Sequence, residues 1–314
     1  MPPILEVQQL VKKYGEKTAV NGINFEIQEA EIFSLLGPNG AGKTTTISVL
    51  STLYAPTSGD ALIGGHSVVR EPMAVRKLIG IVPQDLALYE DLTARENLSF
   101  WGQMYDLSGK ALNARIDQVL DQIGLREHAN QRVRTFSGGM KRRVNIGVGL
   151  LHQPRLLFMD EPTVGIDPQS RRAILDSVKD LNRQGMTVLY TTHYMEEAQE
   201  LSDRVGIIDH GDLIALGTQG ELTRQVGEYE SLQLHLSEMD DADGLAKSLR
   251  SLEGVVRADV IDHSITLITP DAERILASAV SRANERNIKI RSISIQEPNL
   301  EAVFLHLTGR ALRD

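Results

Sequence analysis

The sequence predicts an α/β protein built from two domains, and three observations support this fold class. The 314 residues are enough for two domains of roughly 150 residues each. Short apolar, β-branched runs alternate with helical periods over about the first 220 residues, which is typical of an α/β core. A polar stretch near 219–230 then separates this part from a run of different pattern. We therefore expect one domain over residues 1–222 and a second over 228–314.

Three segments predict buried strands in the first domain. Residues 31–37 (EIFSLLG) form an apolar run that enters a glycine-rich turn, and residues 44–54 then follow a helical pattern. Residues 155–161 and 186–193 have the near-continuous apolar character of central parallel strands. These elements are expected to form the core of the first domain.

A stretch of different character lies between these strands, at about residues 86–136. Thr93 and Glu96 have the spacing of a capping box at the start of a helix. Apolar residues then recur at helical spacing until Gly124: Leu112, Ile116, Val119, Leu120 and Ile123. The pattern indicates an inserted, mostly helical subdomain.

The last part of the chain predicts a second fold class. Residues 204–217 first read as a hairpin that turns at His210 and Gly211. Beyond the polar stretch the segments then follow the order strand, helix, strand, strand, helix, strand. That order is typical of a small ferredoxin-like α+β domain, and one more helix is expected over 300–307.

A glycine-rich loop between the first buried strand and its helix predicts a phosphate site. Residues 37–44 (GPNGAGKT) match the pattern G-x-x-x-x-G-K-[ST] in the required strand-to-helix context. Glycines let backbone amides turn toward phosphate oxygens, and the start of the helix adds its positive dipole end. Lys43 is expected to reach the β- and γ-phosphates and Thr44 to bind Mg²⁺. The predicted nucleotide-binding residues here are Gly37, Pro38, Asn39, Gly40, Ala41, Gly42, Lys43, Thr44 and Thr45.

Two acidic residues end the strand at 155–161. Asp160 suits a carboxylate that binds a metal ion, and Glu161 is expected to polarise the attacking water as general base. A strand that ends in two acids is usually only a solvated edge. The pair gains meaning here because it follows a phosphate loop in the same chain.

A second glycine-rich helix start occurs at residues 136–140 (FSGGM). Ser137 is a plausible N-cap, and Gly138 and Gly139 would let an anion approach the start of the helix. An ordinary capped helix is the alternative. The nucleotide of a neighbouring subunit would explain why one chain has two anion-binding helix starts.

Residues 4–220 resemble the ATP-binding cassette (ABC) family of transport ATPases. GPNGAGKTT is similar to the Walker A loop of the family, LLFMDEP to its Walker B strand and FSGGM to its signature motif. The resemblance implies a P-loop NTPase (RecA-like) core with an N-terminal antiparallel β region. It also implies roles for four residues: Tyr14 stacks on adenine, Gln84 senses the nucleotide and its metal ion, Asp167 lies in the D-loop, and His193 is the switch histidine that contacts the γ-phosphate.

The resemblance further implies cofactors and partners. The cofactors are ATP and Mg²⁺, and two copies would form a head-to-tail homodimer in which Ser137, Gly138 and Gly139 complete the opposite nucleotide site. The signature and the ending at 297–314 look like the drug-export branch, in which separate permease subunits carry the substrate. The expected location is peripheral, on the cytoplasmic face of a bacterial or archaeal inner membrane.

One position departs from the family pattern, and one cluster needs interpretation. Met140 replaces the common glutamine of the signature, and a thioether cannot supply the hydrogen bonds of an amide. The neighbouring basic residues are interpreted as a solvated flank of the signature helix: Arg132, Arg134, Lys141, Arg142 and Arg143.

Composition limits the alternatives. The chain has no cysteine, which excludes disulfides and thiolate chemistry, and its longest apolar runs, of about six residues, are too short to span a membrane. A formal net charge of −9 disfavours a protein whose main partner is nucleic acid. A soluble cassette protein that acts on nucleic acid or the ribosome therefore remains the weaker alternative. A module that binds ATP without hydrolysis is disfavoured because Glu161 and His193 are both present.

Overall fold

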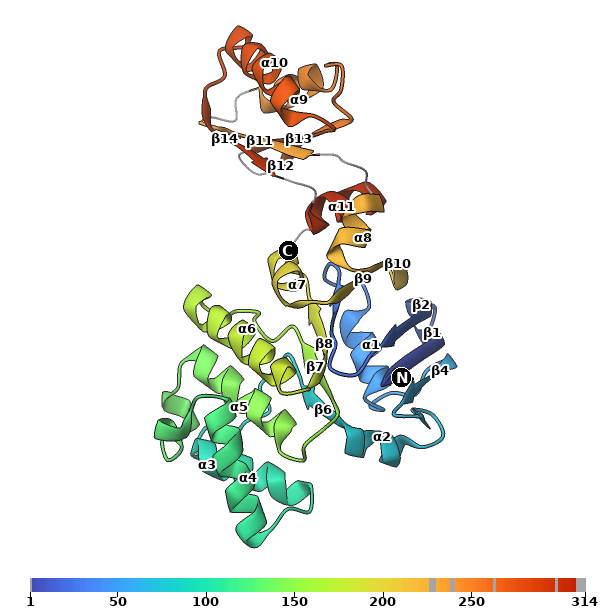
Figure 1. Ribbon diagram of the computed structural model, residues 1–314, viewed down its shortest axis with the longest axis vertical. Helices are drawn as coiled ribbons and strands as arrows, with labels where there is room; N and C mark the ends of the chain where they lie inside the picture. Colours follow the sequence, from blue (N-terminus) through green and yellow to red (C-terminus); the bar gives the residue numbers. More distant parts are fainter. Residues whose placement is uncertain (1, 226–229, 238–240, 262–263, 297–298, 309–314) are drawn as a thin grey trace. The chain divides into compact units, whose positions relative to one another are not determined.

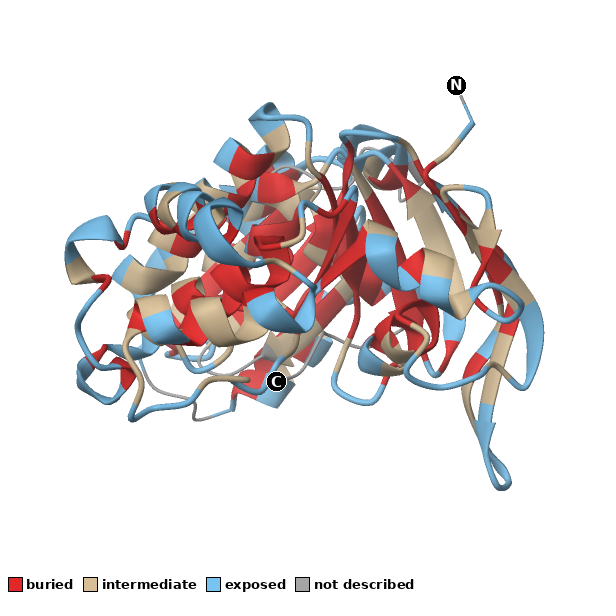
Figure 2. Cartoon of the chain, turned by 90° about the horizontal axis from the view of Figure 1, so that it is seen from below, coloured by how far each residue is buried: buried red, intermediate tan, exposed pale blue. Residues whose placement is uncertain are grey.

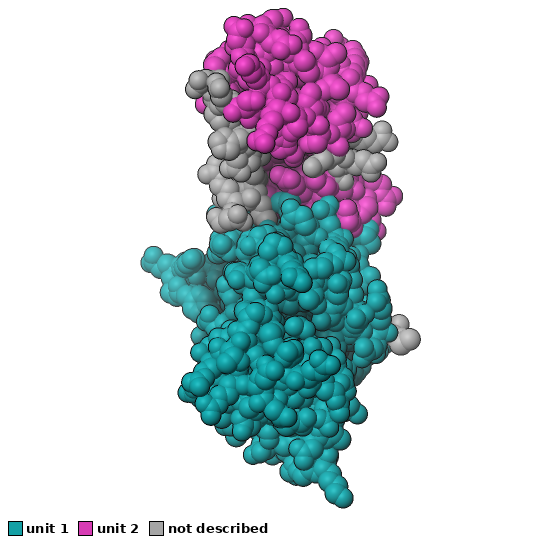
Figure 3. Space-filling view, turned by 90° about the vertical axis from the view of Figure 1, so that its left-hand side faces the viewer, with its two compact units in different colours: residues 1–218, 313–314 teal, residues 219–312 magenta. Residues whose placement is uncertain are grey.

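The computed structural model describes residues 2–225, 230–237, 241–261, 264–296 and 299–308 (Figure 1). The chain divides into two compact units, residues 1–218 with 313–314 and residues 219–312 (Figure 3). This division falls a few residues before the predicted domain end at 222. The stretch interpreted as a polar boundary in fact contains helix α8 (Gln219–Gln225), which contacts helix α11 (Leu300–Thr308) of the second unit.

A six-stranded sheet forms the centre of the first unit, in the order β10-β9-β3-β8-β7-β6. The five strands from β6 to β9 in this order are parallel, and β10 pairs antiparallel with β9. The carboxyl ends of β3, β7 and β8 therefore meet at one edge, where ligands bind in open α/β sheets. The strands are β3 (Ile32–Leu36), β6 (Ile79–Val82), β7 (Leu156–Asp160), β8 (Thr187–Thr192), β9 (Arg204–Asp209) and β10 (Asp212–Gly217).

A second sheet packs on one side of the first. It is antiparallel, in the order β2-β1-β4-β5. Helix α1 (Lys43–Leu50) lies between the two sheets, and its Ile47 and Leu50 share one apolar core with Phe33 of β3 and Leu5 of β1 (Figure 1). The remaining elements are β1 (Leu5–Tyr14), β2 (Lys17–Ile27), β4 (Ser58–Ile63), β5 (His66–Ser67) and α2 (Pro72–Leu78). The N-terminal antiparallel region is thus confirmed.

Helices cover the other face of the six-stranded sheet, and those between β6 and β7 form the inserted helical part. The capping box is present: the Glu96 amide donates to Thr93 Oγ1 at 3.1 Å and the Thr93 amide donates to Glu96 Oε2 at 2.8 Å. The five apolar residues predicted to share a helix face are buried in one core. The helices are α3 (Ala94–Met104), α4 (Gly109–Gln122), α5 (Gly138–Leu150), α6 (Pro168–Arg183) and α7 (Met195–Leu201), with 3₁₀ turns at Arg126–His128 and Val133–Thr135.

Burial follows these layers. Buried residues concentrate on the strands of the central sheet and on the helix faces packed against it (Figure 2). The two faces of the sheet contribute to two separate apolar cores, one shared with α1 and one with α5 and α6. Within the described ranges, no helix is both long enough and apolar enough to cross a membrane.

The second unit has the predicted ferredoxin-like order. Four antiparallel strands are arranged β12-β13-β11-β14, and residues of α9 and α10 share an apolar core with the strands. The elements are β11 (Glu230–Leu236), α9 (Ala242–Leu249), β12 (Arg257–Ile261), β13 (Ser264–Thr269), α10 (Ala272–Glu285) and β14 (Ile290–Gln296). The fold class predicted from the sequence is confirmed for both units.

Candidate active site

The phosphate loop leads from the end of β3 into α1, and its backbone requires glycine at two positions. A Cβ atom on Gly37 would lie 2.2 Å from the carbonyl oxygen of Ile208, and one on Gly42 would lie 2.4 Å from that of Ala19. Gly42 also has a φ of 113°. It is the N-cap of α1 and supplies no side-chain cap, so no side chain at this position competes with a ligand for the first amides of the helix.

Lys43 is buried beside this loop. Its Nζ donates to the carbonyl oxygens of Gly37 at 2.6 Å and Pro38 at 3.0 Å. The same Nζ forms an ion pair with Glu161 Oε1 at 2.9 Å. The first turn of α1 and the end of β7 are therefore joined by a buried pair of opposite charges.

Glu161 connects Lys43 to His193. Its backbone has a φ of 43°, an unusual value for a residue with a side chain, and its amide donates to Thr191 Oγ1 at 3.0 Å. Oε2 of Glu161 lies 3.0 Å from Nδ1 of His193, and both side chains are less than a tenth exposed. The structure thus brings the three predicted catalytic residues into one chain of contacts.

Asp160 and Thr44 lie beside this chain of contacts. Thr191 Oγ1 donates to Asp160 Oδ1 at 2.7 Å. Burial raises the pKa of Asp160 above its ordinary value, while the hydroxyls of Thr191 and Thr44 act in the opposite direction. The sequence did not indicate Thr191, which holds both Asp160 and the backbone of Glu161.

A hollow of about 190 Å³ opens at the phosphate loop. Gln84 and Glu161 both line it, and they follow the ends of the neighbouring strands β6 and β7. An adjoining hollow of about 580 Å³ is lined by Thr44, Gln84 and Asp160 among others. The smaller hollow is lined by Asn39, Gly40, Gly42, Lys43, Thr44, Thr45, Gln84 and Glu161.

The oxygen atoms gathered here fit a magnesium ion. A hydroxyl, an amide oxygen and a carboxylate are hard ligands, which Mg²⁺ prefers. In the described part of the chain, no group of three His, Asp or Glu side chains could hold a metal ion. Mg²⁺ in nucleotide sites is held by one or two protein side chains and by phosphates, so this sparse donor set is compatible with it.

The start of α5 lies elsewhere. Ser137 is its N-cap, since its hydroxyl accepts a hydrogen bond from the Met140 amide at 3.2 Å, and Ser137 and Gly138 are exposed. A Cβ on Gly139 would lie 2.3 Å from that of Ser170, so this glycine lets α5 and α6 pack closely. Asp167 caps α6 and accepts from the Ser170 amide at 3.0 Å. None of the predicted residues on these two helix starts lines the smaller hollow.

Two observations bear on the neighbouring positions. The side chain of Met140 is partly buried and packs against the apolar core between the sheet and the helices. Arg142 was predicted to be solvated, and this is wrong. It is buried, and its guanidinium donates to the carbonyl oxygens of Pro83 at 2.9 Å and Gln84 at 2.8 Å. The side chain of Arg142 therefore joins α5 to the segment that carries Gln84.

Tyr14 lies at the end of β1 and is 46% exposed. Its ring is 6.2 Å from that of Tyr54, edge to face, and the Lys12 ammonium lies 5.1 Å from its centroid. Tyr14 does not line the smaller hollow. Tyr54, a second exposed ring beside it, was not singled out in the sequence.

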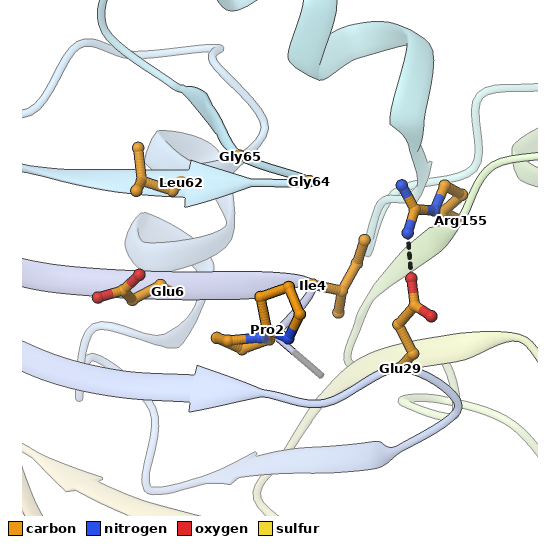
Figure 4. A pocket seen from close by; sticks show the side chains of 9 residues that line it. Pro2, Ile4, Glu6, Glu29, Leu62, Gly64, Gly65 and Arg155 are labelled. Atoms are coloured by element: carbon orange, nitrogen blue, oxygen red, sulfur yellow. Dashed lines mark hydrogen bonds and ion pairs between the residues drawn. The ribbon is translucent and has the colours of Figure 1, made fainter.

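A further hollow of about 490 Å³ lies beside the start of β1 (Figure 4). It is lined mainly by Pro2, Pro3 and the glycines 64–65, and an ion pair between Arg155 and Glu29 lies at its side (Figure 4). It contains none of the predicted site residues.

Known proteins are similar to this chain over its whole length. Residues 20–164 match the family model described as ABC transporter. The linearmycin resistance ATP-binding protein LnrL of Bacillus subtilis is 49% identical, over 99% of this chain and 100% of the relative. The daunorubicin resistance ATP-binding protein DrrA3 of Streptomyces coeruleorubidus is 40% identical, over 95% of this chain and 93% of the relative.

Solved structures agree with the sequence relatives. A dimeric ATP-binding cassette in a post-hydrolysis state, bound to ADP and Pi, superposes with a TM-score of 0.62 at 28% identity, covering 68% of this chain and 98% of that one. The family match, the relatives and this likeness concern the same ATP-binding proteins. The chain therefore belongs to the ABC transporter family and is one of its ATP-binding ATPases.

Proposed function

We propose that this chain is the ATP-hydrolysing subunit of a membrane exporter and that two copies bind head-to-tail around two Mg-ATP. One observation supports the proposal: the phosphate hollow and the glycine-rich start of α5 lie at separate places on the same chain. Lys43 and Glu161 gather at the phosphate hollow, whereas the exposed start of α5 does not line it. A two-fold axis would bring the α5 start of each copy to the nucleotide of the other. The dimeric cassette bound to ADP and Pi supports this arrangement.

The residues of this chain have distinct tasks in the proposed reaction. The first amides of α1 and the ammonium of Lys43 bind the β- and γ-phosphates. Lys43 also contacts Glu161 Oε1, so a phosphate bound to Lys43 competes for the ammonium and leaves this oxygen available to water. Glu161 then accepts a proton from the attacking water, and His193, 3.0 Å from Glu161 Oε2, keeps the carboxylate oriented. The second copy's Ser137 and Gly139 complete the contacts to the γ-phosphate.

Thr44, Gln84 and Asp160 are the residues that would hold Mg²⁺. When bound, the ion neutralises charge that develops on the β- and γ-phosphates. Asp167 would lie close to the second copy at the two-fold interface, and Tyr14 would stack on the adenine through its exposed face.

The export function is inferred from the relatives. Two of them are named for resistance to linearmycin and to daunorubicin, which suggests that a drug or another small molecule is carried outward. We infer that separate permease subunits provide the path. The ATPase subunits would then be peripheral, on the cytoplasmic face of a bacterial or archaeal inner membrane.

Mixing two inactive variants tests the composite site. Lys43→Ala removes the phosphate contact but keeps the start of α5. Ser137→Asp keeps an efficient N-cap but places a negative charge where the opposite γ-phosphate would lie. Each variant alone should not hydrolyse ATP, while an equal mixture should regain about a quarter of wild-type activity, because half of the dimers contain one intact site.

Phosphate release from the mixture is the measurement. Circular dichroism and thermal unfolding of each variant serve as controls for folding. A mixture as inactive as its components would contradict the composite site, and full activity of Ser137→Asp alone would contradict any role of the α5 start.

A further inference from the structure

Glu197 is a buried carboxylate on α7, and the mechanism described above does not use it. Its exposed fraction is 2%, although an ionised carboxylate is costly to bury unless partners compensate for the lost water. The next residue toward the N-terminus, Glu196, is exposed. The chain therefore keeps one of two adjacent glutamates inside, which calls for a specific reason.

Three hydroxyl groups converge on Glu197. Thr163 Oγ1 donates to Oε1 at 2.6 Å, while the hydroxyls of Tyr190 and Thr192 donate to Oε2 at 2.9 Å and 2.8 Å. Burial, and then the negative charge of Glu197, raise the pKa of Tyr190 well above its ordinary value, so its hydroxyl stays protonated and donates. The three donors come from the segment after Glu161 and from the last residues of β8.

Two of these contacts lead directly to the catalytic pair. Thr163 lies two residues after Glu161, in the segment that joins β7 to α6. Thr192 immediately precedes His193, and its hydroxyl also accepts a hydrogen bond from the Tyr194 amide at 2.9 Å. Glu197 therefore fixes the backbone on both sides of His193 and the segment that follows Glu161.

A second path reaches the ring of His193. Arg171 of α6 forms an ion pair with Glu197, with Nε 3.6 Å from Oε1. The guanidinium carbon of Arg171 lies 4.3 Å from the centroid of the Tyr194 ring, and that ring lies 4.1 Å from the ring of His193. The negative charge of Glu197 thus holds Arg171 over Tyr194, which in turn supports the imidazole.

We propose that Glu197 is a positioning residue that fixes the Glu161–His193 pair indirectly, through Thr163, Thr192 and the Arg171–Tyr194 stack. This rests on the proposed role of the pair in hydrolysis. Glu197 touches neither the phosphate hollow nor Lys43, so its contribution belongs to the hydrolytic step and not to ATP binding.

Glu197→Gln tests the role with little change in volume. Glutamine offers one oxygen and one NH₂ group, so at least one hydroxyl loses its acceptor and Arg171 loses its charged partner. We expect kcat to fall about tenfold to a hundredfold, the effect of a small displacement of reacting groups, while KM for ATP stays within about twofold. Glu196→Gln, on the exposed neighbour, should leave both constants unchanged.

Two further variants separate positioning from a general loss of stability. Arg171→Lys keeps the charge but loses the planar group over Tyr194, so kcat should fall about threefold to tenfold. Ile174→Ala removes a buried side chain of α6 that is not part of this network. It should lower the melting temperature, but it should leave kcat unchanged at temperatures at which the variant is still folded. A Glu197→Gln enzyme with wild-type kcat, or a kcat loss that Ile174→Ala reproduces at equal stability, would overturn the proposal.

A readout that does not need hydrolysis distinguishes this inference from the proposed function. The NMR signal of the His193 ring, assigned with His193→Gln, should shift in Glu197→Gln and stay unchanged in Glu196→Gln. A shifted signal in a chain that does not hydrolyse ATP would uphold the positioning role and refute the ATPase mechanism. An unshifted signal, with hydrolysis intact, would refute the positioning role alone.

Discussion

Two helices of the first unit begin at glycines that the sequence marks as anion sites, and the structure treats them differently. Helix α1 begins after Gly42, which supplies no side-chain cap, and buried Lys43 and Glu161 lie beside it. Helix α5 begins after Ser137, whose hydroxyl already satisfies one backbone amide, and this start is exposed. The start of α1 therefore lies beside buried charged side chains of its own chain, whereas the start of α5 is a capped and exposed surface.

The two starts therefore differ in what they offer to a ligand. An uncapped start surrounded by buried charges is prepared for a ligand and costs stability. A capped, exposed start is stable by itself and adds only short polar groups to a surface. Under the proposed function, α1 binds the nucleotide of its own chain and the start of α5 contacts the nucleotide of the second copy, so substitutions at the two starts should have separable effects.

The largest effect is expected on the α1 side. Glu161→Gln removes the carboxylate that would accept the proton of water, so hydrolysis should fall about 10²- to 10⁴-fold while ATP still binds. Phosphate release and equilibrium binding of a fluorescent ATP analogue measure the two steps. Gel filtration with Mg-ATP should then show a stable dimer, because the closed state cannot hydrolyse its nucleotide. Normal turnover in this variant would remove Glu161 as the base.

Much of this site could be predicted because its residues are neighbours in sequence or follow strands. The spacing of residues 37–44 requires a turn into a helix, and Asp160 and Glu161 follow an apolar strand. Ser137 could be assigned as an N-cap because capping depends only on the next three residues. The order of patterns after residue 230 likewise predicted the second unit.

The remaining features depend on contacts between distant segments. Arg142 looks like one of several surface cations, and only the approach of α5 to Pro83 shows that it is buried. Glu197 meets Thr163 only after β7 and β8 have paired. Helix α8 is stabilised by a contact with α11, some 75 residues later, and its polar sequence by itself suggests a linker.

A smaller effect is expected from Gly138→Ala on the α5 side. A Cβ at Gly138 meets only Ile166 Cδ1 at 3.5 Å, an ordinary contact, so the isolated chain should tolerate it. Alanine also favours a helix more than glycine does, so the melting temperature should stay equal or rise. Hydrolysis should nevertheless fall about tenfold, because the methyl group would occupy space used by the opposite nucleotide. Unchanged hydrolysis would place the α5 start outside any composite site.

Removing the charge of Asp160 and removing that of Asp167 should change the stability of the chain at neutral pH with opposite signs. Burial raises the pKa of Asp160, so its cost to stability is absent below about pH 3.8 and is complete above its raised pKa. Asp160→Asn should therefore stabilise the chain at pH 7, and this gain should vanish as the pH falls to about 3.8. Urea unfolding at several pH values measures this gain.

Asp167, the cap of α6, provides the contrast. The hydrogen bond from the Ser170 amide lowers its pKa, so its contribution is present at neutral pH and is lost as the pH falls through the lowered pKa. Asp167→Asn should destabilise the chain at pH 7, and this loss should shrink in acid. Equal signs for the two variants would contradict the difference in environment between the two sides.

The smallest effect separates the two tasks of Ser137. Ser137→Ala and Thr93→Ala each remove a side-chain cap, one from α5 and one from α3, with amide-to-oxygen distances of 3.2 Å and 3.1 Å. Each should cost about 1 kcal/mol of stability, seen as a lower urea midpoint. Thr93 lies outside the proposed nucleotide sites, so its variant should keep the wild-type kcat. If Ser137 also contacts the opposite γ-phosphate, Ser137→Ala should lower kcat a few-fold more than Thr93→Ala does. Equal kcat values would mean that the Ser137 side chain only caps α5, and that backbone amides alone complete the second copy's site.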